Sequence, residues 1–216
     1  MMTRVYGADG DLAAVGDALR SGALALVPTE TVYGVGVAVG AYESSGELPG
    51  PETGYGRIFT LKLRDTAQTV PWLVDGPAAL DEFGLDVPDA LRVLAERLWP
   101  GALTIVVKAS ARVPSFMRAA DGTVALRASA SPAVQRLIGL AGSPLAVTSA
   151  NTHGAPAPAS FVDVEARILE GVDVAVDDGA TACRDASTIV AVRDGAVEIL
   201  REGALSRACI MEALRA

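Results

Sequence analysis

Apolar residues recur along this chain at two spacings, which together predict an alternation of helices and strands. Residues 11–20 carry Leu12, Val15 and Leu19 at helical spacing, and Gly22 follows where such a helix would end. Similar spacing, opened in most cases by a proline or a serine, predicts four further helices, at 88–98, 131–142, 160–168 and 205–215.

Short apolar runs bounded by turn residues predict buried strands. The run from Ala23 to Val27 stops at Pro28, and further runs predict strands at 71–74, 103–107, 123–127, 145–147, 172–176, 187–192 and 196–201. Several strands follow one another without a helix between them, which favours a mixed sheet over a purely parallel one. No repeat or linker interrupts the pattern. We therefore expect an α/β fold with a twisted mixed sheet, formed by one domain over 1–216.

Residues 41–56 show neither the helical nor the strand spacing of apolar residues, and they are rich in Ser, Gly, Pro and Glu. This composition predicts an exposed surface loop or insertion. A mobile lid is the alternative.

Composition and charge narrow the function. Half of the 216 residues are hydrophobic, which is ample for a core, and the net charge of −8 would repel a polyanion. A small-molecule substrate is therefore favoured over a nucleic acid, although a local patch could still contact RNA. With no apolar run of about 20 residues and no apolar leader segment, we expect a cytoplasmic protein that binds no membrane.

The residues needed for zinc or hydrolase chemistry are scarce. Cys183 and Cys209 lie far apart and His153 is the only histidine, so a zinc site is excluded, and unpaired cysteines fit a reducing compartment. Neither a nucleophile elbow nor a P-loop pattern occurs. His153 reads as a surface residue, with a catalytic base as the alternative.

Lys62 and Arg64 are the first candidates for binding chemistry. If this stretch is extended, both side chains point to the same side and could hold a phosphate. Two solvated cations on a surface strand are the alternative reading.

Ser149 and Asn151 follow an apolar strand, at the position where α/β sheets usually bind ligands. Their hydroxyl and amide could bond a phosphate, a ribose or a base, or they could simply form a turn. Arg127 closes another strand and needs an anionic partner, either a ligand carboxylate or an acidic side chain. The hydroxyls within 29–33 could bind an amino acid, and Gly34 and Gly36 permit close approach.

The order of these segments resembles the threonylcarbamoyl-AMP synthase (YrdC-like) family over residues 22–206. The residues that carry the resemblance are Pro28-Thr29-Glu30-Thr31-Val32-Tyr33-Gly34-Val35-Gly36, Lys62-Leu63-Arg64, Leu98-Trp99-Pro100-Gly101-Ala102-Leu103-Thr104, Val124-Ala125-Leu126-Arg127, Ser149-Ala150-Asn151 followed by Gly154, Ser187-Thr188-Ile189-Val190 and Leu200-Arg201-Glu202-Gly203-Ala204.

The resemblance implies a mixed sheet with a large, positively lined concave cavity. It also implies formation of threonylcarbamoyl-AMP and pyrophosphate from ATP, L-threonine and bicarbonate, with Mg²⁺ accompanying ATP. A downstream threonylcarbamoyl-transfer protein complex would then modify adenosine 37 of tRNA, and weak contact of this protein with tRNA is part of the expectation.

Roles for individual residues follow from the same resemblance. Four residues would be catalytic: Lys62, Arg64, Ser149 and Asn151. These four, together with Thr123 and Arg201, would contact ATP. Thr31, Arg127 and Ser187 would contact threonine, and no protein-held metal is expected.

Three features depart from the family pattern: Asp65 after Arg64, Asp75 where the family often has His, and the long 41–56 segment. They leave two alternatives open. One is a divergent paralogue that acts as a carbamoyl-adenylate enzyme on another substrate, and the other is a non-enzymatic RNA-binding module.

Overall fold

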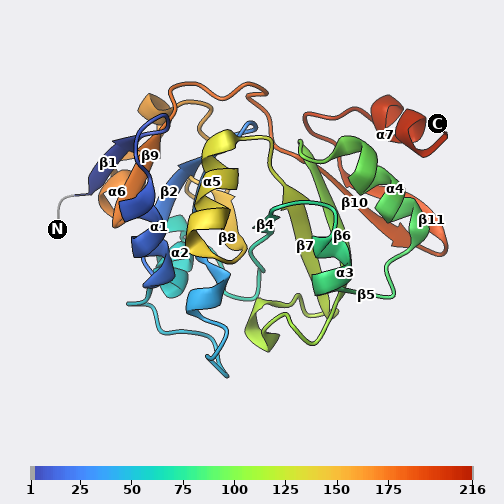
Figure 1. Cartoon of the computed structure of the whole chain (residues 1–216), viewed down its shortest axis with the longest axis horizontal. Coiled ribbons are helices and arrows are strands. Elements are labelled where there is room, and N and C mark those ends of the chain that lie inside the picture. The colour runs from blue at the N-terminus through green and yellow to red at the C-terminus, as the bar shows by residue number, and fades with distance from the viewer. Residues whose placement is uncertain (1–2, 216) are drawn as a thin grey trace.

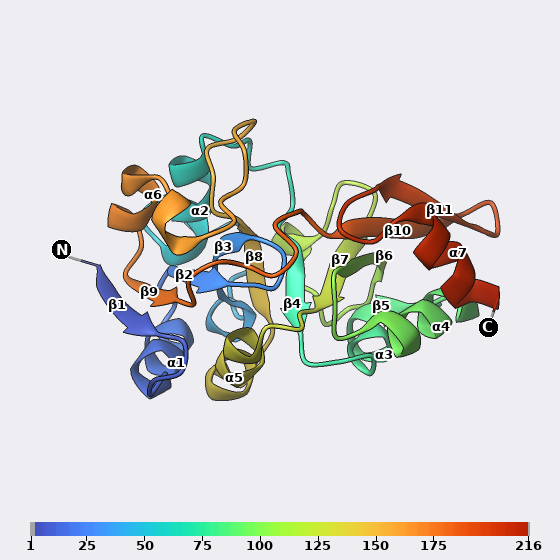
Figure 2. The same ribbon diagram turned by 90° about the horizontal axis from the view of Figure 1, so that it is seen from above.

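The computed structural model describes residues 3–215, whose strands form one twisted sheet (Figures 1 and 2). The order across the sheet is β1-β9-β2-β3-β8-β4-β7-β6-β10-β11, and β5 pairs with β6 beside this path. The strands are β1 Arg4–Gly7, β2 Ala25–Pro28, β3 Tyr33–Ala38, β4 Trp72–Val74, β5 Gly84–Leu85, β6 Leu103–Ala109, β7 Thr123–Ala128, β8 Leu145–Ser149, β9 Val174–Asp177, β10 Thr188–Arg193 and β11 Ala196–Arg201.

The sheet contains both parallel and antiparallel pairs, which confirms the predicted mixed α/β class. β3 pairs antiparallel with β2 and β8, and β8 pairs antiparallel with β4. β4 then pairs parallel with β7, β7 antiparallel with β6, and β6 parallel with β10. Strand ends and connections from distant parts of the chain therefore meet along the middle of the sheet.

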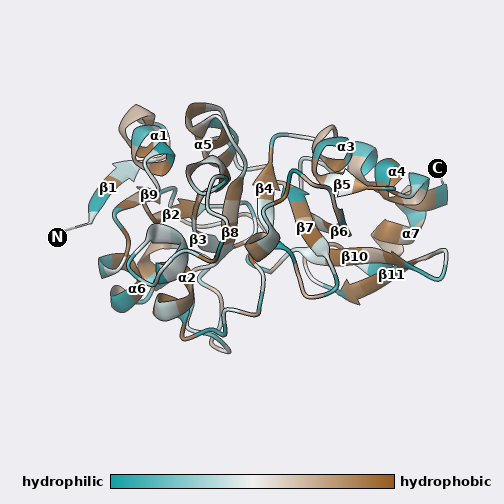
Figure 3. Ribbon diagram, turned by 90° about the horizontal axis from the view of Figure 1, so that it is seen from below, coloured by the Kyte–Doolittle hydropathy of each residue, from teal (hydrophilic) through white to brown (hydrophobic). Residues whose placement is uncertain are grey.

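Helices cover both faces of the sheet. Figures 2 and 3 show α1, α3, α4 and α5 on one side and α2 and α6 on the other. Their bounds are α1 Ala13–Arg20, α2 Gly54–Lys62, α3 Ala79–Phe83, α4 Asp89–Leu98, α5 Pro132–Ala141, α6 Ala166–Glu170 and α7 Arg207–Arg215, with short 3₁₀ turns at Val39–Ala41, Ser115–Met117 and Phe161–Asp163.

The core consists of two apolar clusters. Leu73 packs with the cluster beneath α1 and α5, whereas its neighbours Trp72 and Val74 join the larger cluster. Successive side chains of a strand point to opposite faces, so β4 is buried on both. Burial on both faces is also why the strands read as continuous apolar runs.

Local capping explains why α5 was predicted well. The Ser131 hydroxyl accepts a hydrogen bond from the Val134 amide, Pro132 opens the first turn, and Gly142 ends the helix at φ 68°. These are the signals that residues before and after a helix are expected to provide.

The extended conformation considered for residues around Lys62 is wrong. This segment is α2, whose first turn is capped by the Thr53 hydroxyl, and Leu63 ends it in the left-handed region at φ 51°. The helix also takes the last residues of the predicted 41–56 loop. Packing overrides local preference here, because Tyr55, Ile58 and Phe59 are all buried.

The helix predicted to begin at Ser160 is also shorter and starts later. The Ser160 hydroxyl donates to the Asp163 carboxylate instead of capping a helix, and α6 spans only Ala166–Glu170.

Candidate active site

A cavity of about 250 Å³ lies over the middle of the sheet. Its lining comes from the β2–β3 connection, the ends of β8 and β11, strands β6 and β7, and the segment before β10. Six of the nine residues expected to form a site line this cavity: Thr31, Arg127, Ser149, Asn151, Ser187 and Arg201. The sheet thus brings together side chains that lie up to 170 residues apart.

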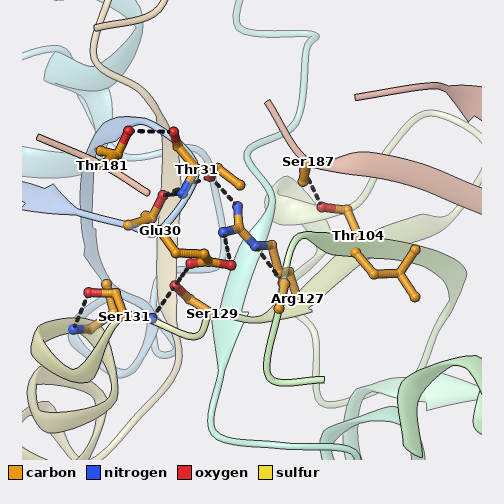
Figure 4. Close-up of polar contacts among 12 residues, drawn as sticks. Glu30, Thr31, Thr104, Arg127, Ser129, Ser131, Thr181 and Ser187 are labelled. Atoms are coloured by element: carbon orange, nitrogen blue, oxygen red, sulfur yellow. Dashed lines mark hydrogen bonds and ion pairs between the residues drawn. The ribbon is translucent and has the colours of Figure 1, made fainter. Parts of the chain in front are cut away.

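Arg127, on β7, is the most completely held cation of the cavity (Figure 4). Its Nε donates to the carbonyl of Gly101 at 3.1 Å, and Nη1 donates to the Thr31 hydroxyl at 2.9 Å. Nη2 forms an ion pair with Glu30 at 2.5 Å, and both side chains are at most 12% exposed. These contacts engage all three nitrogens of the guanidinium and hold it at the cavity lining.

Glu30 is fixed in turn by the residues that follow β7. Its second carboxylate oxygen accepts a hydrogen bond from the Ser129 hydroxyl, and Ser131 donates to the carbonyl of Pro28. Burial alone would raise the pKa of Glu30, but the Arg127 charge and the hydrogen bond from Ser129 outweigh it, so the pKa lies below its usual value. Glu30 is therefore a carboxylate, and it orients Arg127 from outside the cavity lining.

A second polar group lies on the other side of Arg127. The hydroxyls of Thr104 and Ser187 are 2.7 Å apart, as Figure 4 shows. Arg201 donates to the Ser187 carbonyl through Nε and Nη2, at 3.2 and 2.8 Å. The guanidinium of Arg201 is thus tied to the segment before β10, while its residue remains exposed at the cavity rim.

Lys62 and Asn151 contact each other behind the cavity. The ammonium of Lys62 donates to the carbonyls of Ser149 and Asn151 and to the Asn151 side-chain oxygen. Burial, and then the nearby charge of Arg64, lower the pKa of Lys62 to about 8. Asn151 lines the cavity, but Lys62 is not among the residues that do.

Arg64 reaches the same region from the turn after α2. It donates to the Thr148 hydroxyl at 2.9 Å and to the carbonyl of Thr69 at 2.7 Å. Thr148 lines the cavity and Arg64 does not, so Arg64 is connected to the lining through the Thr148 hydroxyl. The two cations of the K-x-R segment therefore approach the end of β8 from a helix terminus, not as neighbours on a strand.

Thr123 lies apart from this group. It begins β7, four residues before Arg127, or about 13 Å along the strand. Its hydroxyl donates to Asp121, and it lines a separate cavity of about 540 Å³ beside β5 and β10. The structure therefore does not bring Thr123 to the other expected ATP-binding residues.

Known proteins share both the sequence pattern and this architecture. A family model described as "Telomere recombination", for the Sua5, YciO and YrdC proteins, matches residues 17–203. The chain belongs to the Sua5/YciO/YrdC family. The resemblance seen in the sequence motifs is thereby confirmed.

Individual relatives within the Sua5/YciO/YrdC family match most of the chain. A Vibrio cholerae threonylcarbamoyl-AMP synthase is 33% identical over 189 residues, covering 83% of this chain and 94% of its own. The Pyrococcus abyssi threonylcarbamoyl-AMP synthase is 32% identical over 87% of this chain, which spans about half (52%) of that protein.

Solved structures of the family agree with the fold. The crystal structure of P. abyssi Sua5 complexed with L-threonine has a TM-score of 0.85 at 27% identity, covering 99% of this chain and 60% of that one. Escherichia coli YciO has a TM-score of 0.77 at 18% identity, covering 94% and 96%. The latter likeness concerns the fold alone.

The departures from the Sua5/YciO/YrdC pattern lie away from the cavity lining. The Asp65 carboxylate accepts a hydrogen bond from the Ala67 amide in its own turn. Asp75 lines a different cavity, beside α5, and no residue of the 41–56 segment lines this one. His153, which was considered as a catalytic base, is exposed and does not line it either. None of these residues adds an acidic or basic group to the lining that Arg127 and Arg201 share.

The sequence motif included Thr104 but gave it no role, and of the segment that crosses the site between β9 and β10 only Ser187 was predicted. Tyr33, which lines the cavity, donates to the Gly179 carbonyl and accepts from the Asp178 amide. The buried Thr181 donates to the carbonyl of Thr31. The 178–187 segment is thereby pinned to the β2–β3 connection, and no local sequence signal marks these contacts.

Proposed function

We propose that this protein is an L-threonylcarbamoyladenylate synthase, which forms threonylcarbamoyl-AMP and pyrophosphate from ATP, L-threonine and bicarbonate. The convergence of Arg127, Ser149 and Arg201 on one cavity carries the proposal. It accords with the names of the Vibrio and Pyrococcus relatives and with the threonine bound in the Pyrococcus structure.

Arg127 is the residue best suited to hold an amino acid. Its guanidinium lines the cavity and could bond the α-carboxylate of threonine. The Thr29 hydroxyl donates to the Val32 carbonyl, so the Thr31 hydroxyl donates to Thr29 and accepts from Arg127. The guanidinium is thus oriented before the ligand arrives, which lowers the entropic cost of binding.

The proposed reaction joins an N-carboxylated threonine to AMP. The carbamate oxygen attacks the α-phosphorus, the bond from that phosphorus to the bridging oxygen breaks, and pyrophosphate leaves. Negative charge grows on the phosphate oxygens, and cations together with hydroxyl donors stabilise it. Arg201 and the Ser149 hydroxyl are the groups in the cavity lining that suit this role.

Mg²⁺ is expected to enter with ATP. Within residues 3–215, no three His, Cys, Asp or Glu side chains gather closely enough to hold a metal ion. Mg²⁺ commonly keeps its waters and binds through substrate phosphates. The phosphates would therefore be its main ligands, and this chain's residues would act on the phosphate oxygens.

The cavity volume indicates how the substrates would be arranged. Its 250 Å³ is below the range of about 300–1,000 Å³ typical of ligand pockets. ATP and threonine together would therefore extend beyond the enclosed part. The carbamate, which decomposes in water, would benefit from a position beside the buried Arg127.

The downstream steps follow from the same proposal. The mixed anhydride would be passed to a threonylcarbamoyl-transfer complex for tRNA modification in the cytoplasm. The net charge of −8 gives no support to an RNA-binding module. No helix within 3–215 is both long and apolar enough to cross a bilayer.

Arg127→Ala tests the assignment of the amino-acid end. Losing a charge-assisted hydrogen bond costs about 2 kcal/mol, so the KM for threonine should rise about 30-fold while that for ATP changes less than threefold. Arg136→Ala is the control, because Arg136 donates to the carbonyls of Ala8 and Gly10, outside the cavity. Equal increases in both KM values would refute the assignment.

A further inference from the structure

Lys62 has an unusual environment for a residue expected to touch a phosphate. It ends α2, its residue is only 2% exposed, and it does not line the cavity. An ammonium has three N–H groups. The Lys62 ammonium meets three acceptors, namely the carbonyls of Ser149 and Asn151, the latter at 2.7 Å, and the Asn151 side-chain oxygen at 3.1 Å.

The Asn151 amide is equally committed to the protein. Its oxygen accepts from Lys62, and its nitrogen donates to the carbonyls of Thr152 and Ala155, at 3.1 and 2.6 Å. Both N–H groups of the amide are therefore used. Ser149 differs, because it lines the cavity and no hydrogen bond within the described part of the chain involves its hydroxyl.

The backbone connects the same residues a second time. The His153 amide donates to the Lys62 carbonyl at 2.8 Å, and the Ala150 amide donates to the Tyr33 carbonyl at 2.8 Å. Lys62 thus contacts the 149–153 turn through both its side chain and its carbonyl. The turn is attached to α2 on one side and to β3 on the other.

We propose, building on the proposed function, that Lys62 is a positioning residue: its ammonium fixes the 149–153 turn so that the Ser149 hydroxyl faces the nucleotide, and it does not itself bond a phosphate. Lys62 does not line the cavity, and all three of its N–H groups already have acceptors, so to bond a phosphate the ammonium would have to give up at least one of them. An unsatisfied buried group costs about 1–3 kcal/mol, which opposes that exchange.

The protonation of Lys62 fits this role. With a pKa near 8, the ammonium form predominates below pH 8, where all three acceptors are served. Above pH 8 the neutral amine has only two N–H groups and places a lone pair beside the carbonyls. Arg64 disfavours the charged form and Glu165 favours it, and these are the charged groups that act on Lys62.

A double-mutant cycle separates positioning from direct contact. ATP affinity is measured for the wild type, Lys62→Met, Ser149→Ala and the double variant. If Lys62 acts through Ser149, each single change weakens binding about tenfold and the double variant loses no more than either. Independent phosphate contacts would instead multiply to about 100-fold, which would overturn the proposal.

Lys108→Met is the matched control, because Lys108 is the chain's other lysine and lines the separate cavity beside β5. It should leave ATP affinity within twofold of the wild type. If Lys62→Met does not fold, Lys62→Gln is used instead. Its amide keeps part of the hydrogen bonding, so its own effect is smaller, and the test is whether that effect disappears in the Ser149→Ala background.

Hydrogen exchange gives a readout that does not depend on nucleotide binding. In Lys62→Met the amides of Ala150 and His153 should exchange at least tenfold faster, and in Lys108→Met they should not change. Unchanged exchange in Lys62→Met would overturn the proposal even if the protein binds ATP. If the wild type binds no ATP, the proposed function fails, and the exchange measurement still decides the role of Lys62.

Discussion

The ion pair between Glu30 and Arg127 gives the sharpest prediction about stability. Both side chains are nearly buried, at 12% and 7% exposure. Removing one partner of such a pair costs about 3–5 kcal/mol. Glu30→Gln keeps an oxygen that can accept from Arg127, so we expect about 3 kcal/mol. At about 2–4 °C per kcal/mol for a chain of this size, Tm should fall by about 6–12 °C.

The pH dependence of this loss follows from the pKa of Glu30, which is lower in the folded protein than its usual 4.5. A lowered folded pKa contributes stability above the unfolded pKa, and the contribution disappears as pH falls through the folded pKa. The difference in Tm between the wild type and Glu30→Gln should therefore be full at pH 6–7. It should begin to shrink below about pH 4.5.

Calorimetry from pH 7 down to pH 4 measures both effects. Glu82→Gln is the control, because its ion pair with Arg112 is exposed, at 43% and 68%, and should contribute at most about 1 kcal/mol. A Tm for Glu30→Gln within 2 °C of that control at pH 7 would refute the account of a buried, orienting pair.

Two further predictions concern the backbone around the cavity. Gly36→Ala should lower the free energy of unfolding, measured in urea, by about 3 kcal/mol, because the new methyl group would overlap the carbonyl of Ala146 on β8. Gly139→Ala is the control: it lies on α5 with open space around it, and should raise that free energy by about 1 kcal/mol. Equal changes in the two variants would contradict this packing. Tyr33→Phe removes the hydroxyl that is hydrogen-bonded to Gly179 and Asp178, so the free energy of unfolding should fall by about 1–3 kcal/mol. The amides of residues 178–181 should also exchange faster. Unchanged exchange there would contradict the attachment of this segment to Tyr33.

The sequence predicts best those elements whose signals are local. β6, β7 and α5 lie close to their predicted ranges, since each is bounded by turn or capping residues. β3 was not predicted, because Gly34 and Gly36 are poor strand formers in isolation. Its strand conformation depends on β8, where a side chain at Gly36 would have no room.

The same difference between local signals and long-range contacts applies to the candidate site. Motif order brought six expected residues to one cavity, because the motifs sit at strand ends and connections that the sheet gathers. The sequence could not show that Lys62 is saturated by acceptors 87 and 89 residues away. It also gave no role to Thr104, although the motif includes it, because threonine is ordinary in a strand.

The central claim is that one cavity binds ATP beside an amino acid and couples them through bicarbonate. The most direct measurement is pyrophosphate release from ATP and Mg²⁺, with threonine and bicarbonate each present or absent, followed by mass analysis of the nucleotide product. We predict release only when both are present, together with a threonylcarbamoyl-AMP mass. Release that is independent of threonine and bicarbonate, with AMP or ADP as the only product, would contradict the account.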